Sequence, residues 1–295
     1  MRVELSIITV NYNGLEDTCA LIDSIPSDDK IEVIVVDNGS RSDEAVLVSS
    51  RYPHVRTIRS SQNLGFAGGN NIGIKAARGQ FLYLINNDTV FTGFDVQSLI
   101  DRLASSPRIA VVCPKIRFAR SARHIQFAGY TPLTPITLRN RAIGYGEEDC
   151  GQYDSPHPIP YAHGAAMMVS REAIGEVGLI PECYFLYYEE MDWSTMFTRA
   201  GYEIWYDPGS TIYHKDSQTT GAGSPLKTYY MTRNRLLFAS RNSSGARRLA
   251  TFCYLILMVG PRDVARHLLN RHPGQAKATL RGLYDFCRKK QGQLI

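Results

Sequence analysis

Short runs of consecutive apolar residues recur through the first hundred positions of the chain. They occupy residues 5–10, 31–36, 55–58 and 81–85, and segments of helical character lie between them. Runs that are apolar at every position are typical of strands buried on both faces, as in a parallel sheet. The pattern predicts a β-α-β-α-β-α-β order and an α/β fold, with an open, mostly parallel, doubly wound sheet that has helices on both faces.

Polar residues gather where these predicted strands end. Asn11 and Tyr12 follow the first strand, Asp37 and Asn38 follow the second, and residues 86–88 follow the fourth. The carboxyl ends of parallel strands share one edge of the sheet, where open α/β proteins bind ligands. A turn explains Asn, Asp or Gly at any single strand end, but it explains three such ends less well. We therefore expect a ligand crevice at this edge.

A glycine-rich segment, residues 62–71, leads into a helix expected at residues 70–78. Glycines allow the backbone to approach a ligand, although a tight strand-to-helix turn explains them equally well. Their spacing matches neither the GxGxxG dinucleotide fingerprint nor the GxxxxGK[ST] phosphate loop. The segment therefore argues against NAD binding and ATP hydrolysis of those types.

Two groups of side chains suggest metal and acid–base chemistry. Asp88 is a suitable hard ligand for magnesium or manganese when substrate phosphates complete the coordination, although a turn role is more common. His214 is either a metal ligand or a structural imidazole. Glu189, Glu190 and Asp192 crowd together among aromatic residues. Such crowding raises the pKa of at least one carboxyl, as a general base requires, but acidic residues also favour a first helical turn.

The charge is distributed unevenly along the 295 residues. The formal net charge is +5, whereas residues 226–295 carry 14 Lys or Arg against two Asp, a net of +12. The longest apolar stretch, residues 249–259, lies in this basic part. A helix needs about 20 residues to cross a bilayer, so the stretch is either buried or in contact with lipid head groups. We expect a basic helical C-terminal extension with an anionic partner; a solvated helical surface is the alternative.

The composition bounds the class of protein. With 44% hydrophobic and 21% charged residues, the chain is a folded globular protein rather than a disordered one. Six widely spaced cysteines without a CxxC pair indicate reduced thiols, and residues 1–10 lack the features of a secretory signal. We expect a cytoplasmic protein with a binding and catalytic domain at residues 1–225 and the extension at residues 226–295.

Taken in order, these motifs resemble the inverting family-2 glycosyltransferases of the GT-A fold, especially their bacterial rhamnosyltransferase-like branch. The resemblance covers roughly residues 4–240. It rests on an opening strand, a base-binding motif, a nucleotide-sugar loop, a DxD-like motif, an acidic catalytic motif and two closing signatures. These are residues 6–13, 35–40, 63–70, 86–88, 188–193, 213–214 and 233–235.

The resemblance implies a role for each candidate residue. Those implied to contact the uracil or thymine base, ribose, diphosphate or sugar of a donor are Thr9, Asn11, Tyr12, Asp37, Asn38, Asn63, Gly65, Phe66, Asn70, Asn87 and Arg233. Asp88 is implied to bind Mg²⁺ or Mn²⁺, with His214 as a second ligand. Glu190 is implied to be the base, with Glu189 and Asp192 shaping the site.

Two departures from the family pattern affect these roles. The first carboxylate of the DxD motif is an amide, Asn86, which implies weaker metal binding before the donor arrives. The usual Glu-Asp pair of the catalytic motif is Glu189-Glu190, so the choice of base between Glu190 and Asp192 stays open.

The resemblance also implies an activity. We expect a metal-dependent, inverting transferase that moves L-rhamnose from dTDP-rhamnose to a hydroxyl of a saccharide acceptor in bacterial surface polysaccharide synthesis. The alternatives are a UDP-sugar transferase (N-acetylglucosamine or galactose) and a non-catalytic nucleotide-sugar-binding protein. We expect a saccharide or polyprenyl-linked acceptor and no nucleic acid. The extension is expected to contact the inner face of the membrane, the acceptor or a second subunit in a homodimer.

Overall fold

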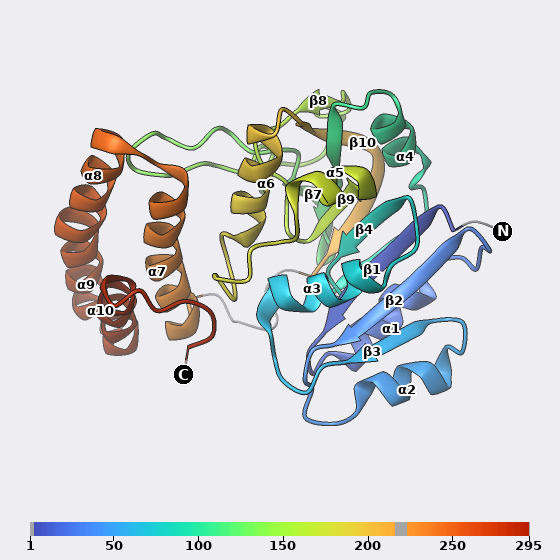
Figure 1. Cartoon of the computed structure of the whole chain (residues 1–295), viewed down its shortest axis with the longest axis horizontal. Coiled ribbons are helices and arrows are strands. Elements are labelled where there is room, and N and C mark those ends of the chain that lie inside the picture. The colour runs from blue at the N-terminus through green and yellow to red at the C-terminus, as the bar shows by residue number, and fades with distance from the viewer. Residues whose placement is uncertain (1–2, 216–222, 295) are drawn as a thin grey trace.

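A computed structural model describes residues 3–215 and 223–294, which form one ten-stranded sheet with helices around it (Figure 1). The strands are β1 Leu5–Asn11, β2 Ile31–Asp37, β3 Arg56–Arg59, β4 Phe81–Ile85, β5 Thr89–Val90, β6 Ile109–Phe118, β7 Ser121–Phe127, β8 His157–Pro158, β9 Ala166–Ser170 and β10 Glu203–His214. The helices are α1 Leu15–Asp23, α2 Glu44–Arg51, α3 Gly65–Ala76, α4 Gln97–Ala104, α5 Arg171–Val177, α6 Glu189–Arg199, α7 Pro225–Asn242, α8 Gly245–Cys253, a π-helical segment Tyr254–Val259, α9 Gly260–Leu269 and α10 Pro273–Cys287.

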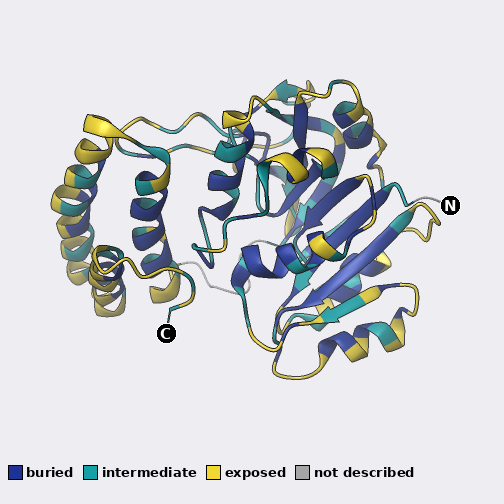
Figure 2. Cartoon of the chain, in the orientation of Figure 1, coloured by how far each residue is buried: buried dark blue, intermediate teal, exposed yellow. Residues whose placement is uncertain are grey.

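The first four strands confirm the predicted α/β alternation. They lie in the order β3-β2-β1-β4, and every pairing among them is parallel. β1, β2 and β4 are buried almost throughout (Figure 2), which is the reason that their sequences are apolar at consecutive positions. The carboxyl ends of β1 and β2 meet directly, since Asn11 pairs with Asp37.

Beyond β4 the sheet becomes mixed rather than continuing in parallel. β9 lies between β4 and β6 and runs antiparallel to both, while β6 pairs in parallel with β10. The chain between β6 and β9 passes through β7 and then through residues 128–165, which are mostly irregular and contain the short strand β8. This long excursion brings β9 into the sheet in the opposite direction, without the helical crossover that a parallel strand needs.

The glycine-rich segment differs from the prediction. α3 begins at Gly65, so most of the segment is helix rather than a loop before residue 70. The glycines let this helix pack closely on β1: a Cβ at Gly69 would lie 2.7 Å from Val10 Cγ1, and one at Gly73 would lie 2.3 Å from Ile8 Cγ2. Close packing of helix against strand therefore explains the composition of the segment.

The basic C-terminal part is helical, as expected. α7 to α10 lie together at the end of the molecule opposite β3 (Figure 1). They share a second apolar core with earlier parts of the chain, because Leu237 and Val259 pack in one cluster with Leu138, Tyr184 and Tyr188. The apolar stretch at residues 249–259 covers the end of α8 and the π-helical segment. Within the described ranges, no helix has the length and apolar character to span a membrane.

Candidate functional site

The adjoining ends of β1 and β2 present two buried polar atoms, Asp37 Oδ2 and Thr9 Oγ1, that have no hydrogen-bond partner among the described residues. Asp37 is fully buried, and its Oδ1 accepts the N–H of Ser40 at 3.0 Å. Its Oδ2 accepts no hydrogen bond from the described residues and lies 3.6 Å from Arg59 Nε. The buried hydroxyl of Thr9 in β1 is also unpartnered within that part of the chain. Buried polar groups normally have partners, so these two are available to a ligand.

Asn11 and Asn87 organise the turn between β1 and α1. Asn11 Nδ2 donates to Glu44 Oε2 at 2.7 Å, and Asn11 Oδ1 accepts the Thr18 hydroxyl at 2.9 Å. Asn87 Nδ2 donates to Thr18 Oγ1 at 3.1 Å and to Gly14 O at 3.3 Å. Both amides therefore hold loops in place at the strand ends.

Asn38 joins the end of β2 to the start of α3. Its Nδ2 donates to Asn63 Oδ1 at 3.2 Å and to Gly65 O at 3.0 Å. Gly65 has φ +73°, and a Cβ there would lie only 2.1 Å from Phe185 O. Only glycine fits this position, so the helix start is fixed against the segment that precedes α6.

The first turn of α3 also approaches the acidic helix α6. Phe66 N donates to Phe185 O at 2.9 Å. A Cβ at Gly164 would lie 3.7 Å from Phe66 Cζ and 3.8 Å from Glu190 Cγ, so these two side chains flank Gly164. Asn70 is buried, and its Nδ2 donates to Phe66 O at 2.9 Å, which holds this turn. Phe66 and Glu190 thus come together from distant parts of the sequence.

Asp88 and His214 form a pair suited to a divalent cation. Asp88 Oδ1 lies 3.1 Å from His214 Nε2, and both side chains are largely buried. His214 Nδ1 lies 2.9 Å from Gln126 Oε1, whereas Nε2 has no hydrogen-bond partner among the described residues. Adjacent ligands of an octahedral ion with bonds of about 2.1 Å lie about 3.0 Å apart. The pair therefore fits Mg²⁺ or Mn²⁺.

The remaining ligands of such an ion have to come from elsewhere. Residues 3–215 and 223–294 contain no group of three or more His, Cys, Asp or Glu side chains placed to hold a metal. Substrate phosphates and water are the usual additional ligands of magnesium in such sites.

The two glutamates at the start of α6, Glu189 and Glu190, have surroundings that disfavour their charged forms. Glu189 is buried, and its Oε2 has no partner within the described ranges. Burial, and secondarily the charge of Glu190, raises the pKa of Glu189 well above its ordinary value. Burial also raises the pKa of Glu190, whose side chain remains half-buried.

Asp192 has different surroundings from these glutamates. Its Oδ2 accepts hydrogen bonds from the Tyr184 hydroxyl at 3.0 Å and from Arg241 Nε at 2.6 Å, and its Oδ1 accepts one from Asn242 Nδ2 at 2.6 Å. Both oxygens are thus engaged in joining α6 to the C-terminal end of α7.

A stacked pair of rings, Tyr130 and His163, lies near both Glu190 and the Asp88–His214 pair, and the sequence analysis did not predict it. The rings of Tyr130 and His163 stack with centroids 5.8 Å apart, and the His163 ring lies 6.5 Å from that of His214. Burial, and then the charge of His214, lowers the pKa of His163 to about 3. Burial, and then the charge of Glu190, raises the pKa of Tyr130. The only signal in the sequence was a lone histidine before Gly164.

Two predicted donor residues differ from the others in their surroundings. Tyr12, which directly follows Asn11 at the end of β1, is exposed. Arg233 is buried in α7, where Nη2 donates to Tyr184 O at 2.7 Å and Nη1 donates to Gly292 O at 2.8 Å. Arg233 therefore holds the segment that leads into α6.

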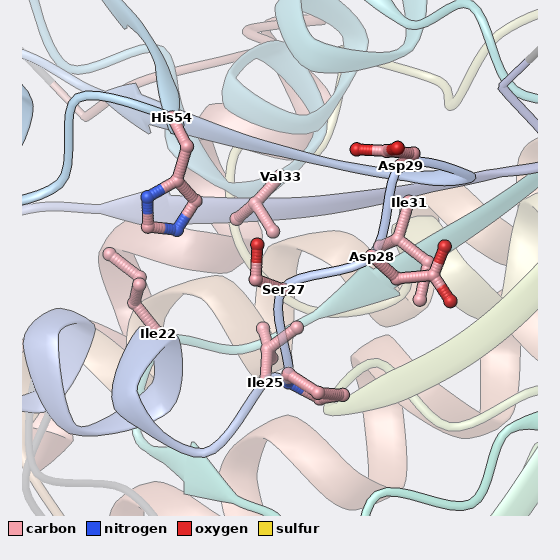
Figure 3. A pocket seen from close by; sticks show the side chains of 9 residues that line it. Ile22, Ile25, Ser27, Asp28, Asp29, Ile31, Val33 and His54 are labelled. Atoms are coloured by element: carbon pink, nitrogen blue, oxygen red, sulfur yellow. The ribbon is translucent and has the colours of Figure 1, made fainter. Parts of the chain in front are cut away.

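A pocket of about 180 Å³ lies at the other edge of the sheet (Figure 3). His54, Asp28 and Asp29 line it where α1 leads into the amino end of β2. None of the predicted site residues lines this pocket, and ligand pockets are usually larger, about 300–1,000 Å³. It therefore has no part in the site described above.

The chain is similar in sequence to two proteins that are named as glycosyltransferases. The chain is 27% identical over 276 residues to the low-salt glycan biosynthesis hexosyltransferase Agl10 of Haloferax volcanii, covering 92% of this chain and 87% of that protein. It is 25% identical over 271 residues to the N-acetylglucosaminyl-diphospho-decaprenol L-rhamnosyltransferase of Mycobacterium tuberculosis, covering 82% and 85%.

Solved structures support the expected fold. A mannosyltransferase from Pyrobaculum calidifontis, in complex with GDP-Man and Mn²⁺, superposes with a TM-score of 0.59 at 14% identity, covering 98% of this chain and 88% of that one. Together with the mixed sheet, this similarity confirms the GT-A fold. Residues 6–178 match the model of glycosyl transferase family 2. Because this match takes in more than half of the chain, the protein belongs to glycosyl transferase family 2.

Proposed function

We propose that the protein is an inverting, metal-assisted glycosyltransferase that moves a sugar from a nucleoside diphosphate donor to a saccharide hydroxyl. One observation carries the proposal. Glu190, whose pKa is raised, flanks Gly164, and the ring of the preceding residue, His163, lies 6.5 Å from that of His214 in the Asp88–His214 pair. These are the two components that such a transfer needs: a base for the acceptor and a site for a cation beside the leaving group.

The donor is proposed to carry thymine or uracil. Asp37 Oδ2, which has no hydrogen-bond partner among the described residues and lies 3.6 Å from Arg59 Nε, is proposed to accept the ring N–H of such a base, and the Thr9 hydroxyl is proposed to donate to a ring carbonyl. L-rhamnose is the preferred sugar because the relative from Mycobacterium tuberculosis is named an L-rhamnosyltransferase. A UDP-sugar donor remains the alternative.

Asp88 and His214 are proposed to hold Mg²⁺ or Mn²⁺ together with the donor's diphosphate oxygens. Bound there, the ion supplies positive charge that offsets the negative charge developing on the departing nucleoside diphosphate. Asn11, Asn38, Asn63 and Asn87 are proposed to act by fixing the surrounding loops, as their hydrogen bonds suggest.

Glu190 is proposed to be the base. The acceptor hydroxyl gives its proton to the Glu190 carboxylate while its oxygen bonds to the anomeric carbon, and the nucleoside diphosphate leaves from the opposite face. The single displacement inverts that carbon. Glu189, with the more strongly raised pKa, is proposed to keep the proton of the pair so that Glu190 ionises. Asp192 and Arg233 are proposed as positioning residues, because their polar atoms are engaged with other parts of the chain.

The acceptor is proposed to be a saccharide on a polyprenyl diphosphate at the cytoplasmic face of the membrane. The support is the name of the mycobacterial relative, which specifies a decaprenol-linked substrate.

Isothermal titration with dTDP-rhamnose, UDP-sugars and GDP-mannose, each with and without Mg²⁺ or Mn²⁺, tests the proposal. We expect metal-dependent binding of dTDP-rhamnose, and loss of that metal dependence in Asp88→Ala. Preference for a UDP-sugar would move the donor to the alternative. If no nucleotide sugar binds with either metal, the proposed function is wrong.

A further inference from the structure

The outermost helix of the molecule carries an uncharged exposed stripe. α8, the π-helical segment and α9 run without a break over residues 245–269, at the edge farthest from β3 (Figure 1). Exposed residues recur there at spacings of three or four: Ala250, Cys253, Leu257, Pro261, Ala265 and Leu269. Strict spacing of four drifts around an ordinary helix of 3.6 residues per turn, but the wider π-helical turn absorbs the drift. The six residues therefore lie along one face of the helix, here called the outer stripe.

Large apolar side chains widen the outer stripe. Leu257 and Met258 are each 65% exposed, Leu249 is 65% exposed and Leu269 is 84% exposed. Figure 2 shows the outer faces of α8 and α9 as exposed. So many large apolar groups on one helix face mark an interaction surface rather than ordinary scattered exposure.

The charges beside the outer stripe are almost all positive. Arg248, Arg262 and Arg266 are exposed next to it. The acidic residue of this helix, Asp263, is 24% exposed, with Oδ1 2.7 Å from Arg262 Nη2 and 3.9 Å from Arg266 Nη2. Arginine side chains that border an apolar helix face suit the anionic head groups of a lipid layer.

We propose that residues 245–269 lie in the head-group layer of an anionic membrane, with the outer stripe inserted toward the acyl chains. The alternation of apolar stripe and cationic border is the pattern of an in-plane amphipathic helix. A second copy of the chain suits this face less well, because a two-fold interface would set arginines against arginines. No helix in the described parts of the chain is able to span the bilayer instead.

In this placement, the membrane-bound helix packs against the segment that carries Glu189 and Glu190. Leu255 and Val259, on the inner side of the helix, pack in one cluster with Tyr184 and Tyr188, which directly precedes Glu189. A polyprenyl-linked acceptor would then meet Glu190 at a fixed height above the bilayer. That consequence rests on the proposed function, whereas membrane binding itself does not.

Vesicle flotation of the full chain without donor tests the proposal. The vesicles contain phosphatidylcholine either alone or with phosphatidylglycerol. We expect binding to the anionic vesicles to be at least tenfold stronger. Leu257→Gln/Met258→Gln should weaken that binding about tenfold or more, since it scales with inserted apolar area. The matched control is Val46→Gln/Leu47→Gln, an adjacent pair on α2 that is 56% and 49% exposed, and it should bind like the wild type.

The charges are tested separately. Arg248→Gln/Arg266→Gln should weaken binding to anionic vesicles about 25-fold, because each cation near such a surface contributes about fivefold. Thermal melting checks that each variant folds.

Three results would overturn the proposal. The first is that the wild type fails to float with anionic vesicles, and the second is that the outer-stripe and α2 variants bind equally. The third is that sedimentation shows a dimer of the wild type and that only the outer-stripe substitutions dissociate it. The last result would assign the face to a second copy. Donor titration of the same preparation distinguishes each of these from failure of the proposed function.

Discussion

At the scale of single residues, Glu190 and Asp192 lie in the same helix but have opposite surroundings. Glu190 is half-buried beside Phe66 and Gly164. Asp192 is buried and receives hydrogen bonds from Tyr184, Arg241 and Asn242 on its two oxygens. A base needs an oxygen that is free to accept the proton of the acceptor hydroxyl. The two carboxylates should therefore respond differently to amide substitution.

We expect Glu190→Gln to reduce kcat by about 10²- to 10⁴-fold with little change in thermal stability, because an amide cannot accept the proton. Asp192→Asn should do the reverse. It removes the charge that holds Arg241 and should lower the free energy of unfolding by about 1–3 kcal/mol, with turnover per folded molecule largely kept. Single-turnover kinetics and denaturant unfolding of both variants check this. If Asp192→Asn lost activity at full stability, it would take the base role instead.

Glu189 gives a prediction about pH. Its pKa is raised in the folded state, so the folded protein binds more protons than the unfolded chain at pH values between the ordinary value of 4.5 and the raised one. Stability therefore falls as pH rises through this window, and the loss persists above it. It amounts to about 1.4 kcal/mol per unit of pKa elevation.

Glu189→Gln removes this penalty. The variant should melt above the wild type at pH 8, and the difference should shrink toward pH 4.5. Glu172→Gln, an exposed glutamate in the first turn of α5, is the matched control and should follow the wild type across the range. A wild type that is relatively more stable at pH 8 would contradict the expectation.

At the scale of elements, α3 connects the strand ends to the acidic helix. Its first residue bonds to Asn38, and its second donates to the carbonyl of Phe185. The glycines farther along bring the helix close to β1. A change at the start of α3 should therefore alter the positions of both the strand ends and the segment that leads into α6.

We expect Gly65→Ala to destabilise the protein by about 1–3 kcal/mol and to weaken donor binding. The reason is that alanine is strained at φ +73° and its Cβ would meet Phe185 O. Gly175→Ala is the control, since that glycine lies in α5 with no atom within 4 Å of an added Cβ. It should stabilise the protein by about 0.5–1 kcal/mol. Denaturant unfolding measures both, and equal effects would refute the role given to Gly65.

At the scale of the whole molecule, the C-terminal helices pack through apolar side chains against the segment that leads into α6. The larger core surrounds the sheet, whereas the second contains Leu138, Tyr184 and Tyr188 together with residues of α7 and the π-helical segment. Buried polar bonds add to this link, since Asn234 Nδ2 donates to Leu186 O at 2.6 Å and to Tyr187 O at 3.0 Å. The division expected at residues 225 and 226 coincides with the start of α7.

Such shared burial predicts one cooperative unfolding transition. The two tryptophans, Trp193 and Trp205, report on α6 and β10, whereas far-ultraviolet circular dichroism is weighted toward the helices of the whole chain. We expect both probes to give the same midpoint in guanidinium chloride. An earlier transition by circular dichroism would show instead that the C-terminal helices unfold independently.

The sequence alone determined the local features of this protein. Continuous apolar runs place β1, β2 and β4, because strands buried on both faces exclude polar residues. The order of the motifs also indicated the family that the comparison confirmed. The strands are readable because each depends on residues that are close together in the chain, and the order of the motifs is itself a property of the sequence.

Tertiary structure decided the features that depend on contacts between distant residues. The antiparallel entry of β9, the bonds from Arg241 and Asn242 to Asp192, and the packing of Gly69 against Val10 each join segments far apart in sequence. The stacking of Tyr130 on His163 is of the same kind. Residue type and spacing do not predict such pairings, because burial and hydrogen bonding depend on which distant segments the fold brings together.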